Sequence, residues 1–174
     1  MSSSAQPTTS LSTNDPATGG SPLSQNSSPT LPPPVSDEEA EYYYSGLPSA
    51  PILVARTSTT PWEMPSGPWA RHGAKELRPA GGHPIAEAME GDLPPKLFAI
   101  LRSMEAKWTS IDVVRIGIVE KDPTPFPVIL WIGVSPGSLS RSDGVIVAFK
   151  CREALVECGI TDVDVEIRES EVHR

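Results

Sequence analysis

The chain has 174 residues, enough for one domain and an appendage, and its 22 acidic residues outnumber its 14 lysines and arginines to give a formal net charge of -8. Nucleic acid is bound through a basic face that neutralises phosphates, so this balance argues against a nucleic-acid partner. The sequence holds no apolar run of the roughly 18 residues that a membrane span needs, and it begins without the basic and apolar regions of a secretion signal. We therefore expect no membrane association and an intracellular location, cytoplasmic or nuclear.

Residues 1–41 are predicted to form a disordered acidic arm. They are mainly Ser, Thr, Pro, Asn and Gln, which bury too little apolar surface to offset the entropy of ordering. The proline-rich run at residues 29–34 favours a polyproline II conformation, either as a stiff linker or as a ligand of a proline-binding domain. Residues 36–39, Ser-Asp-Glu-Glu, resemble a site for an acidophilic kinase or form a solvated charge run.

A single domain is expected from residue 42 to residue 174. Its first part, residues 42–92, reads mostly as loop, with one short apolar edge strand at residues 52–56. Proline and glycine are frequent after that strand, which argues against regular structure there. The compact part, residues 93–174, is predicted as α-β-β-α-β.

The first helix of the compact part begins at Pro94 or Pro95, because proline is tolerated in a first helical turn, and ends at about Lys107. Its apolar residues recur at the spacing of one helix face, which predicts an amphipathic helix. That face comprises Leu97, Ile100, Leu101 and Met104.

Residues 109–134 contain two strands rich in Val and Ile, joined by a loop with several prolines. Both faces of each strand are largely apolar, so we expect the pair at the centre of the sheet. The seven-residue connection at residues 121–127 suits an antiparallel hairpin, since a parallel crossover needs a dozen or more residues.

A second helix is predicted over residues 144–158, with Gly159 and Ile160 forming a Schellman C-cap, and a half-buried strand over residues 163–168. The two cysteines, Cys151 and Cys158, lie on the buried face of this helix. They are about 10 Å apart along its axis, too far for a disulfide, which favours a reducing environment.

These elements predict an α+β fold: a small antiparallel or mixed sheet with two helices on one face, preceded by the disordered arm. With residues 52–56 as the first strand, the order becomes β-α-β-β-α-β, that of a ferredoxin-like fold or a variant. The nearly forty residues between that strand and the first helix are then expected to pack over the sheet.

The sequence shows no catalytic constellation. It lacks the Gly-x-Ser-x-Gly motif of serine hydrolases, and its histidines and cysteines lack the spacing of metal ligands. We therefore expect no catalytic residues, no metal and no cofactor.

An anion-binding or ligand-binding site is one candidate, at the Ser-rich loop between the second strand of the hairpin and the second helix. Such a turn directs backbone N–H groups, hydroxyls and the positive end of a helix dipole at one point. Its residues would be Gly137, Ser138, Ser140 and Arg141. Ordinary capping of the helix by the serines is the alternative.

An interaction surface is the other candidate, because aromatic and basic residues alternate after the edge strand. It comprises Trp62, Trp69, Arg71, Lys75 and Arg78. In the alternative reading, the two tryptophans pin a long loop onto the sheet. The acidic residues 37–41 could also fold back onto this basic cluster.

Several stretches of the sequence resemble a large family of uncharacterised fungal proteins. The resemblance spans about residues 43–174 and is carried by residues 43–49, 54–63, 75–79, 108–117, 128–140 and 163–172. It implies no activity and no functional residues. Longer relatives continue into a segment suggestive of a trypsin-like fold, which this sequence does not contain, so the resemblance implies that the chain is an N-terminal module.

Three functional hypotheses follow. The first is a non-enzymatic interaction or regulatory module that binds a protein partner. The second is a small-ligand or anion-binding domain, or a small enzyme, that uses the Ser-rich loop. The third is a truncated gene product. Neither the partner nor the oligomeric state follows from the sequence.

Overall fold

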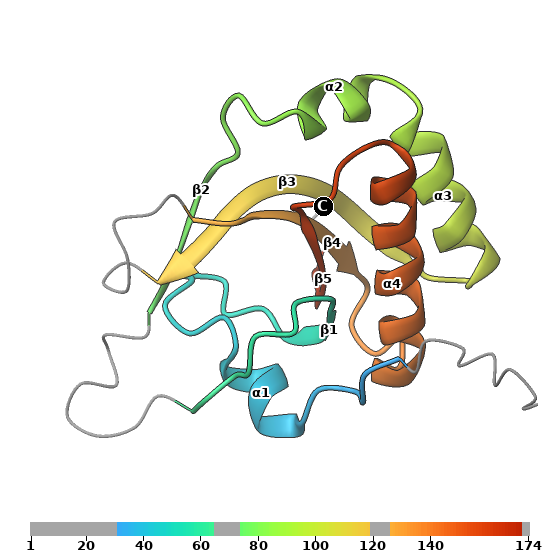
Figure 1. Cartoon of the computed structure of the whole chain (residues 1–174). Helices are drawn as coiled ribbons and strands as arrows, with labels where there is room; N and C mark the ends of the chain where they lie inside the picture. The colour runs from blue at the N-terminus through green and yellow to red at the C-terminus, as the bar shows by residue number, and fades with distance from the viewer. Residues whose placement is uncertain (1–30, 65–73, 119–125, 172–174) are drawn as a thin grey trace, which may run out of the picture. The chain divides into compact units, whose positions relative to one another are not determined.

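A five-stranded mixed sheet forms the centre of the fold, with the strand order β1-β5-β4-β3-β2 (Figure 1). The computed structural model describes residues 31–64, 74–118 and 126–171. Strands β4 and β5 are parallel, and the other neighbouring pairs are antiparallel. The strands are β1 (Leu53–Arg56), β2 (Lys75–Pro79), β3 (Trp108–Ile118), β4 (Val128–Val134) and β5 (Asp164–Glu169).

Strand β4 lies at the middle of the sheet because its side chains are apolar on both faces. Each of its seven residues is buried. It pairs antiparallel with β3 from Trp108↔Val134 to Arg115↔Val128, which confirms the predicted hairpin. Two apolar faces need a cover on each side, so the fold has three layers.

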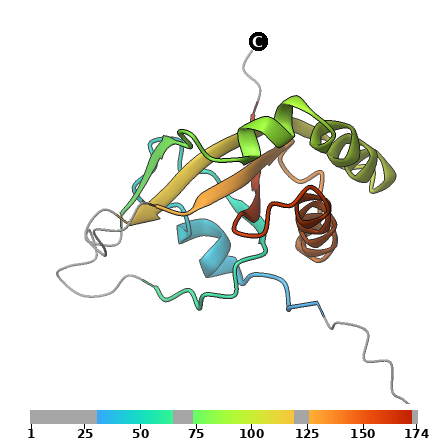
Figure 2. The same cartoon turned by 45° about the horizontal axis from the view of Figure 1, so that its top comes forward.

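Two helices, α3 (Leu93–Ser103) and α4 (Arg141–Glu157), cover one face of the sheet, and the short α2 (Ile85–Glu90) precedes them (Figures 1 and 2). Leu97 and Leu101 of α3 are fully buried together with Leu130 of β4. At the end of α4, Gly159 has a φ of 81° and the Ile160 N–H donates to the Leu155 carbonyl at 2.9 Å. This is the predicted Schellman cap, and it turns the chain towards β5.

The second face of the sheet is covered by α1 (Asp37–Tyr42) and the residues after it, 43–47. Tyr44 and Leu47 pack against Ile116, Ile129 and Trp131. The helix begins at Ser36, whose Oγ accepts the Glu39 N–H at 3.1 Å. The helix therefore starts within the stretch predicted as a disordered arm. The sequence did not predict it because six residues are too few to show a helical period. Residues 1–30 of that arm lie outside the described residues.

The strand order differs from that of the ferredoxin-like prediction. In the ferredoxin-like order the first strand would lie beside the second strand of the hairpin, whereas here β5 takes that place and β1 pairs with β5 at the edge. The α+β class and the mixed sheet are as predicted. A fifth strand, β2, comes from the region expected to be loop and pairs with β3. The long connection thus supplies an edge strand and a helix, which accounts for its length.

Residues Leu31–Arg174 form one compact unit, so the expected domain begins somewhat before residue 42. Residues 43–47 belong to this unit because Tyr44 and Leu47 pack in the core on the second face of the sheet. Helix α1 belongs to it through the ion pair of Glu39 with Arg56 of β1. None of the helices in the described part of the chain is long and apolar enough to pass through a bilayer.

Candidate functional site

The Ser-rich loop is a tight turn whose hydrogen-bond donors already have acceptors within the domain. Gly137, with a φ of 65°, donates its N–H to the Glu169 carboxylate at 2.8 Å. Ser138 donates both its N–H and its hydroxyl to the Ser135 carbonyl, at 3.0 and 2.6 Å. An anion entering this turn would therefore have to replace the carboxylate of Glu169.

Ser140 and Arg141 lie at the start of α4 and are also engaged. The Ser140 Oγ accepts the Asp143 N–H at 3.1 Å, which makes it the N-cap of the helix, and its hydroxyl donates to the Asp143 carboxylate. Arg141 forms an ion pair with Asp37 at 2.5 Å. The four predicted residues thus lie in one segment, where Ser140 caps α4 and the other three bond to groups within the domain. An anion site there stays a prediction.

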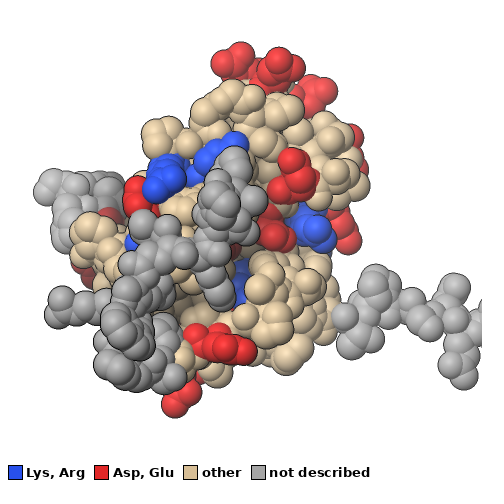
Figure 3. All heavy atoms as spheres, turned by 60° about the vertical axis from the view of Figure 1, so that its left-hand side comes forward, with Lys and Arg blue, Asp and Glu red and all other residues tan. Residues whose placement is uncertain are grey.

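The residues of the predicted interaction surface do not form one patch among the described residues. Trp62 is half-buried, and Trp69 and Arg71 lie outside the described residues. Lys75 and Arg78 both lie on β2 but at positions of opposite parity, so they point to opposite faces of the sheet. On the side of the domain that carries β2, Figure 3 shows basic side chains interspersed with acidic ones. Arg78 itself pairs with Glu76 at 3.0 Å.

The acidic segment of α1 does fold back onto the domain, though onto partners other than those predicted. Glu39 accepts a hydrogen bond from Arg56 of β1 at 2.7 Å, and both side chains are nearly buried. Asp37 pairs with Arg141 of α4. These ion pairs fasten α1 to β1, the next element along the chain, and to α4, which lies 104 positions away at the paired residue.

The sequence interpretation missed a polar cluster beneath α1, which we call the Glu166 cluster: Glu166, Tyr43, Tyr44, Trp131 and Lys75. Glu166 of β5 is only 2% exposed and accepts hydrogen bonds from the Tyr43 hydroxyl at 2.6 Å and the Tyr44 hydroxyl at 2.7 Å. Trp131 of β4 donates its indole N–H to the Tyr44 hydroxyl at 2.9 Å. The Lys75 Nζ lies over the Tyr43 ring, 2.9 Å from its centroid.

Burial perturbs the titration of this cluster. Desolvation, followed by the negative charge of Glu166, raises the pKa of the Tyr43 and Tyr44 phenols well above its usual value. Desolvation also lowers the pKa of the Lys75 ammonium to about 8, although the nearby Glu166 charge opposes this shift. Perturbed groups often mark active sites. Here both phenols donate to one carboxylate, so the hydrogen bonds serve to attach residues 43–47 to the sheet.

Replacing Lys75 with methionine tests the lowered pKa. Below about pH 8 the Lys75 ammonium is charged in both the folded and the unfolded chain, and its burial without water destabilises the folded chain. Between about pH 8 and 10.5 the unfolded chain binds more protons, so the wild-type protein gains stability with pH relative to the variant. The gain is expected to reach up to about 3 kcal/mol, at about 1.4 kcal/mol per unit of pKa shift.

The measurement for Lys75→Met is urea denaturation at several pH values from 7 to 10.5. Lys150→Met, at an exposed position of α4, is the matched control. A difference in unfolding free energy between wild type and Lys75→Met that stays constant with pH contradicts the assignment.

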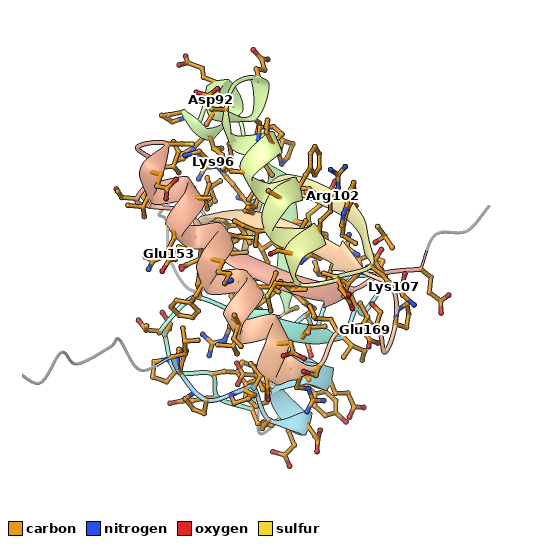
Figure 4. All side chains as sticks on the ribbon, turned by 90° about the vertical axis from the view of Figure 1, so that its right-hand side faces the viewer. Asp92, Lys96, Arg102, Lys107, Glu153 and Glu169 are labelled. Carbon is orange, nitrogen blue, oxygen red and sulfur yellow. The ribbon has the colours of Figure 1, made fainter. Side chains whose placement is uncertain are left out.

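An aromatic pair, one ring half-buried and the other exposed, lies at the end of the sheet where β3 begins. The rings of Phe98 from α3 and Trp108 from β3 stack with centroids 5.2 Å apart and an interplanar angle of 19°. Trp108 is 38% exposed, the most exposed tryptophan among the described residues. The basic residues Arg102 and Lys107 lie on the same part of the chain, and both are exposed (Figure 4). We call these four residues the aromatic–basic surface.

The sequence carried a signal for this surface. Phe98 lies off the apolar stripe of its helix, one position after Leu97, and therefore has no place in the core of an amphipathic helix. Arg102 follows it at the i+4 position, on the same side of the helix. Only the tertiary structure, however, brings Trp108 against Phe98.

Other chemistry finds little support. Cys151 is buried, and burial raises the pKa of its thiol to about 12, which argues against a nucleophilic thiolate. No group of three or more potential metal ligands occurs within residues 31–64, 74–118 and 126–171. No protein-family model, no curated protein and no solved structure matches this chain.

Proposed function

We propose that the protein is a non-enzymatic interaction module that binds an acidic segment of a protein partner on its aromatic–basic surface. The observation that carries the proposal is the stacking of the half-buried Phe98 on the exposed Trp108. Arg102 lies one helical turn after Phe98, and Lys107 directly precedes Trp108 in the chain; neither side chain forms an ion pair with any described residue.

The composition of this surface matches that of protein-binding hot spots. Tryptophan and arginine are enriched among the residues that dominate binding energy, since they bury a large area and offer a polar group at its rim. Stacking fixes the indole ring of Trp108 before binding, so less side-chain entropy is lost on association. The two cations select an acidic partner and accelerate its encounter.

A ligand-binding role for the Ser-rich loop is less well supported, because Gly137, Ser138, Ser140 and Arg141 all have internal partners. Binding through Trp62, Trp69, Arg71, Lys75 and Arg78 stays a prediction. We also infer from the resemblance that the chain corresponds to the N-terminal module of longer fungal proteins. The aromatic–basic surface supports an interaction role for such a module.

The test combines affinity capture from a cell lysate with mapping of the captured protein on a peptide array. We expect the mapped segment to be acidic. A synthetic peptide of that segment should lose about 30-fold in affinity for Trp108→Ala, corresponding to about 2 kcal/mol of a hot-spot aromatic. Isothermal titration calorimetry measures this loss, and circular dichroism checks that the variant is folded.

Two charge variants should change the affinity for the acidic peptide in opposite directions. Arg102→Glu should weaken binding, whereas Glu105→Gln, which removes an exposed acid from the loop beside Lys107, should strengthen it. Arg78→Glu on β2 serves as the control and should leave the affinity unchanged. Capture that is insensitive to Trp108→Ala, or a mapped segment without acidic residues, refutes the proposal.

A further inference from the structure

A cluster of donors lies above Gly133 on the sheet face that carries Trp131. A Cβ atom at Gly133 would come within 2.7 Å of the Thr109 Oγ1, 2.8 Å of the Ser110 Oγ and 2.9 Å of the Ser170 Cβ. Glycine at this position is therefore what allows the hydroxyls of β3 to lie directly over the β4 backbone. A register shift of β3 between Trp108 and Ser110 accompanies this arrangement.

Arg168 of β5, which pairs with Gly133, extends beside these hydroxyls. Its guanidinium Cζ lies 3.8 Å from the centroid of the Trp131 ring, and its side chain is only 13% exposed. The Nη2 atom is 3.5 Å from the Ser110 Oγ and 3.6 Å from the Asp112 carboxylate, both longer than a good hydrogen bond. We call Arg168, Thr109, Ser110 and Asp112 the Arg168 cluster.

This cluster holds donors that the domain does not use. Within the described residues, the buried Thr109 Oγ1 and the buried Arg168 Nε have no hydrogen-bond partner. Buried polar groups are nearly always paired, so each such group calls for an explanation. Burial also lowers the pKa of Arg168, and the negative charge of Asp112 offsets this shift only in part.

We propose that the Arg168 cluster binds the phosphate group of a small ligand. A guanidinium donates along two parallel directions and suits a tetrahedral oxyanion, and the hydroxyls of Thr109 and Ser110 supply further donors on the β3 side. The phosphate takes the position beside Nη2 that the carboxylate of Asp112 now occupies. Asp112 is able to leave because its side chain is 45% exposed. The site is separate from the aromatic–basic surface and does not depend on the function proposed for it.

The carboxylate of Asp112 competes with the phosphate for Arg168, so removing its charge should strengthen phosphate binding. Asp112→Asn keeps the size of the side chain and removes the competing charge, so it should tighten phosphate binding about 5-fold to 10-fold, as expected for one neighbouring charge. Arg168→Lys keeps the charge but removes the planar pair of donors, and should weaken binding by at least about 10-fold.

The experiment titrates the ¹⁵N-labelled full chain with inorganic phosphate and, separately, with O-phosphoserine, and follows the Arg168 Nε–Hε and Ser110 amide signals by NMR. Acetate at equal ionic strength is the control for selectivity. Saturable shifts at Arg168 and Ser110 with both phosphates but not with acetate support the proposal. Shifts with inorganic phosphate alone also support the proposal and restrict the ligand to free phosphate, whereas shifts with both show that the site accepts a phosphate monoester.

Three outcomes overturn the proposal. The first is the absence of saturable shifts at Arg168 and Ser110. The second is an affinity that does not change in Asp112→Asn, which lies at a partly exposed position and leaves the core untouched. The third is a saturable response confined to Gly137 and Arg141, since it would place the anion at the Ser-rich loop. Arg141→Lys is the matched variant for that loop and should leave the Arg168 response unchanged.

Discussion

Replacing Glu166 with alanine is expected to lower the free energy of unfolding by about 3 kcal/mol. The change leaves the hydroxyls of Tyr43 and Tyr44 buried without an acceptor, and each unsatisfied group costs about 1–3 kcal/mol. It also opens a cavity beneath the ring of Tyr44, which is 1% exposed. Urea denaturation followed by tryptophan fluorescence measures the loss.

Two further variants separate the hydrogen bonds from the cavity. Glu166→Leu keeps the volume and should cost nearly as much as the alanine, because both hydroxyls still lack an acceptor. Adding Tyr43→Phe removes one of those hydroxyls and should restore part of the stability. Tyr44 is left unchanged because it also accepts the Trp131 indole N–H. If Glu166→Ala unfolds at the same urea concentration as the exposed Glu76→Ala, the buried carboxylate does not hold residues 43–47 in place.

Replacing Gly46 with alanine is expected to cost about 2–3 kcal/mol. Gly46 has a φ of 99°, which disfavours any residue with a Cβ atom by about 1–2 kcal/mol. A Cβ here would also lie 2.7 Å from the Ala74 Cβ and 2.9 Å from the Lys75 backbone nitrogen. Relieving these contacts would pull the neighbouring Ser45 carbonyl away from the Lys75 N–H, to which it is bonded at 2.7 Å.

Gly81→Ala is the matched control, because Gly81 also has a positive φ, of 68°, but a Cβ there would meet nothing within 4 Å. The control should cost only the backbone strain, about 1 kcal/mol. The difference between the two glycines in thermal or urea denaturation measures the close approach of residue 46 to β2. Equal losses for both would show that the contact with Ala74 and Lys75 adds nothing.

The elements with a strong local pattern could be predicted from the sequence. Strand β4 and helix α4 show it most clearly: one is a run of Val, Ile and Leu, and the other ends at a Gly159 cap. Their boundaries fall within a few residues of those expected, because caps and hydrophobic periods act over one or two turns. The short β1 (Leu53–Arg56) was also expected, from the apolar run that begins at Ile52.

The strand order and β2 could not be predicted, because they depend on contacts between distant segments. β2 reads Lys-Glu-Leu-Arg-Pro, which has no apolar face of its own and forms a strand only against β3. Local sequence patterns likewise do not predict that β5 lies between β1 and β4.

The Glu166 cluster could not be predicted for a related reason. Glu166 occupies a position in β5 that alternates with Val165 and Ile167, so it reads as the solvated side of a half-buried strand. It is buried because Tyr43 and Tyr44, which lie 123 and 122 positions earlier in the chain, cover it and donate hydrogen bonds to it. The Arg168 cluster depends on the same strand and on a glycine of β4, and no spacing in the sequence links them.

The pairing of Tyr43 with Glu166 spans 123 positions along the chain, and this has a consequence for synthesis of the protein. A ribosome that adds about 5–20 residues per second takes roughly 6–25 seconds to pass from one to the other. During that interval β1 has no strand partner and the β3–β4 hairpin emerges with one apolar face uncovered. Residues 43–47, which cover this face, are synthesised first, but Glu166, the acceptor that holds them, is synthesised only with β5.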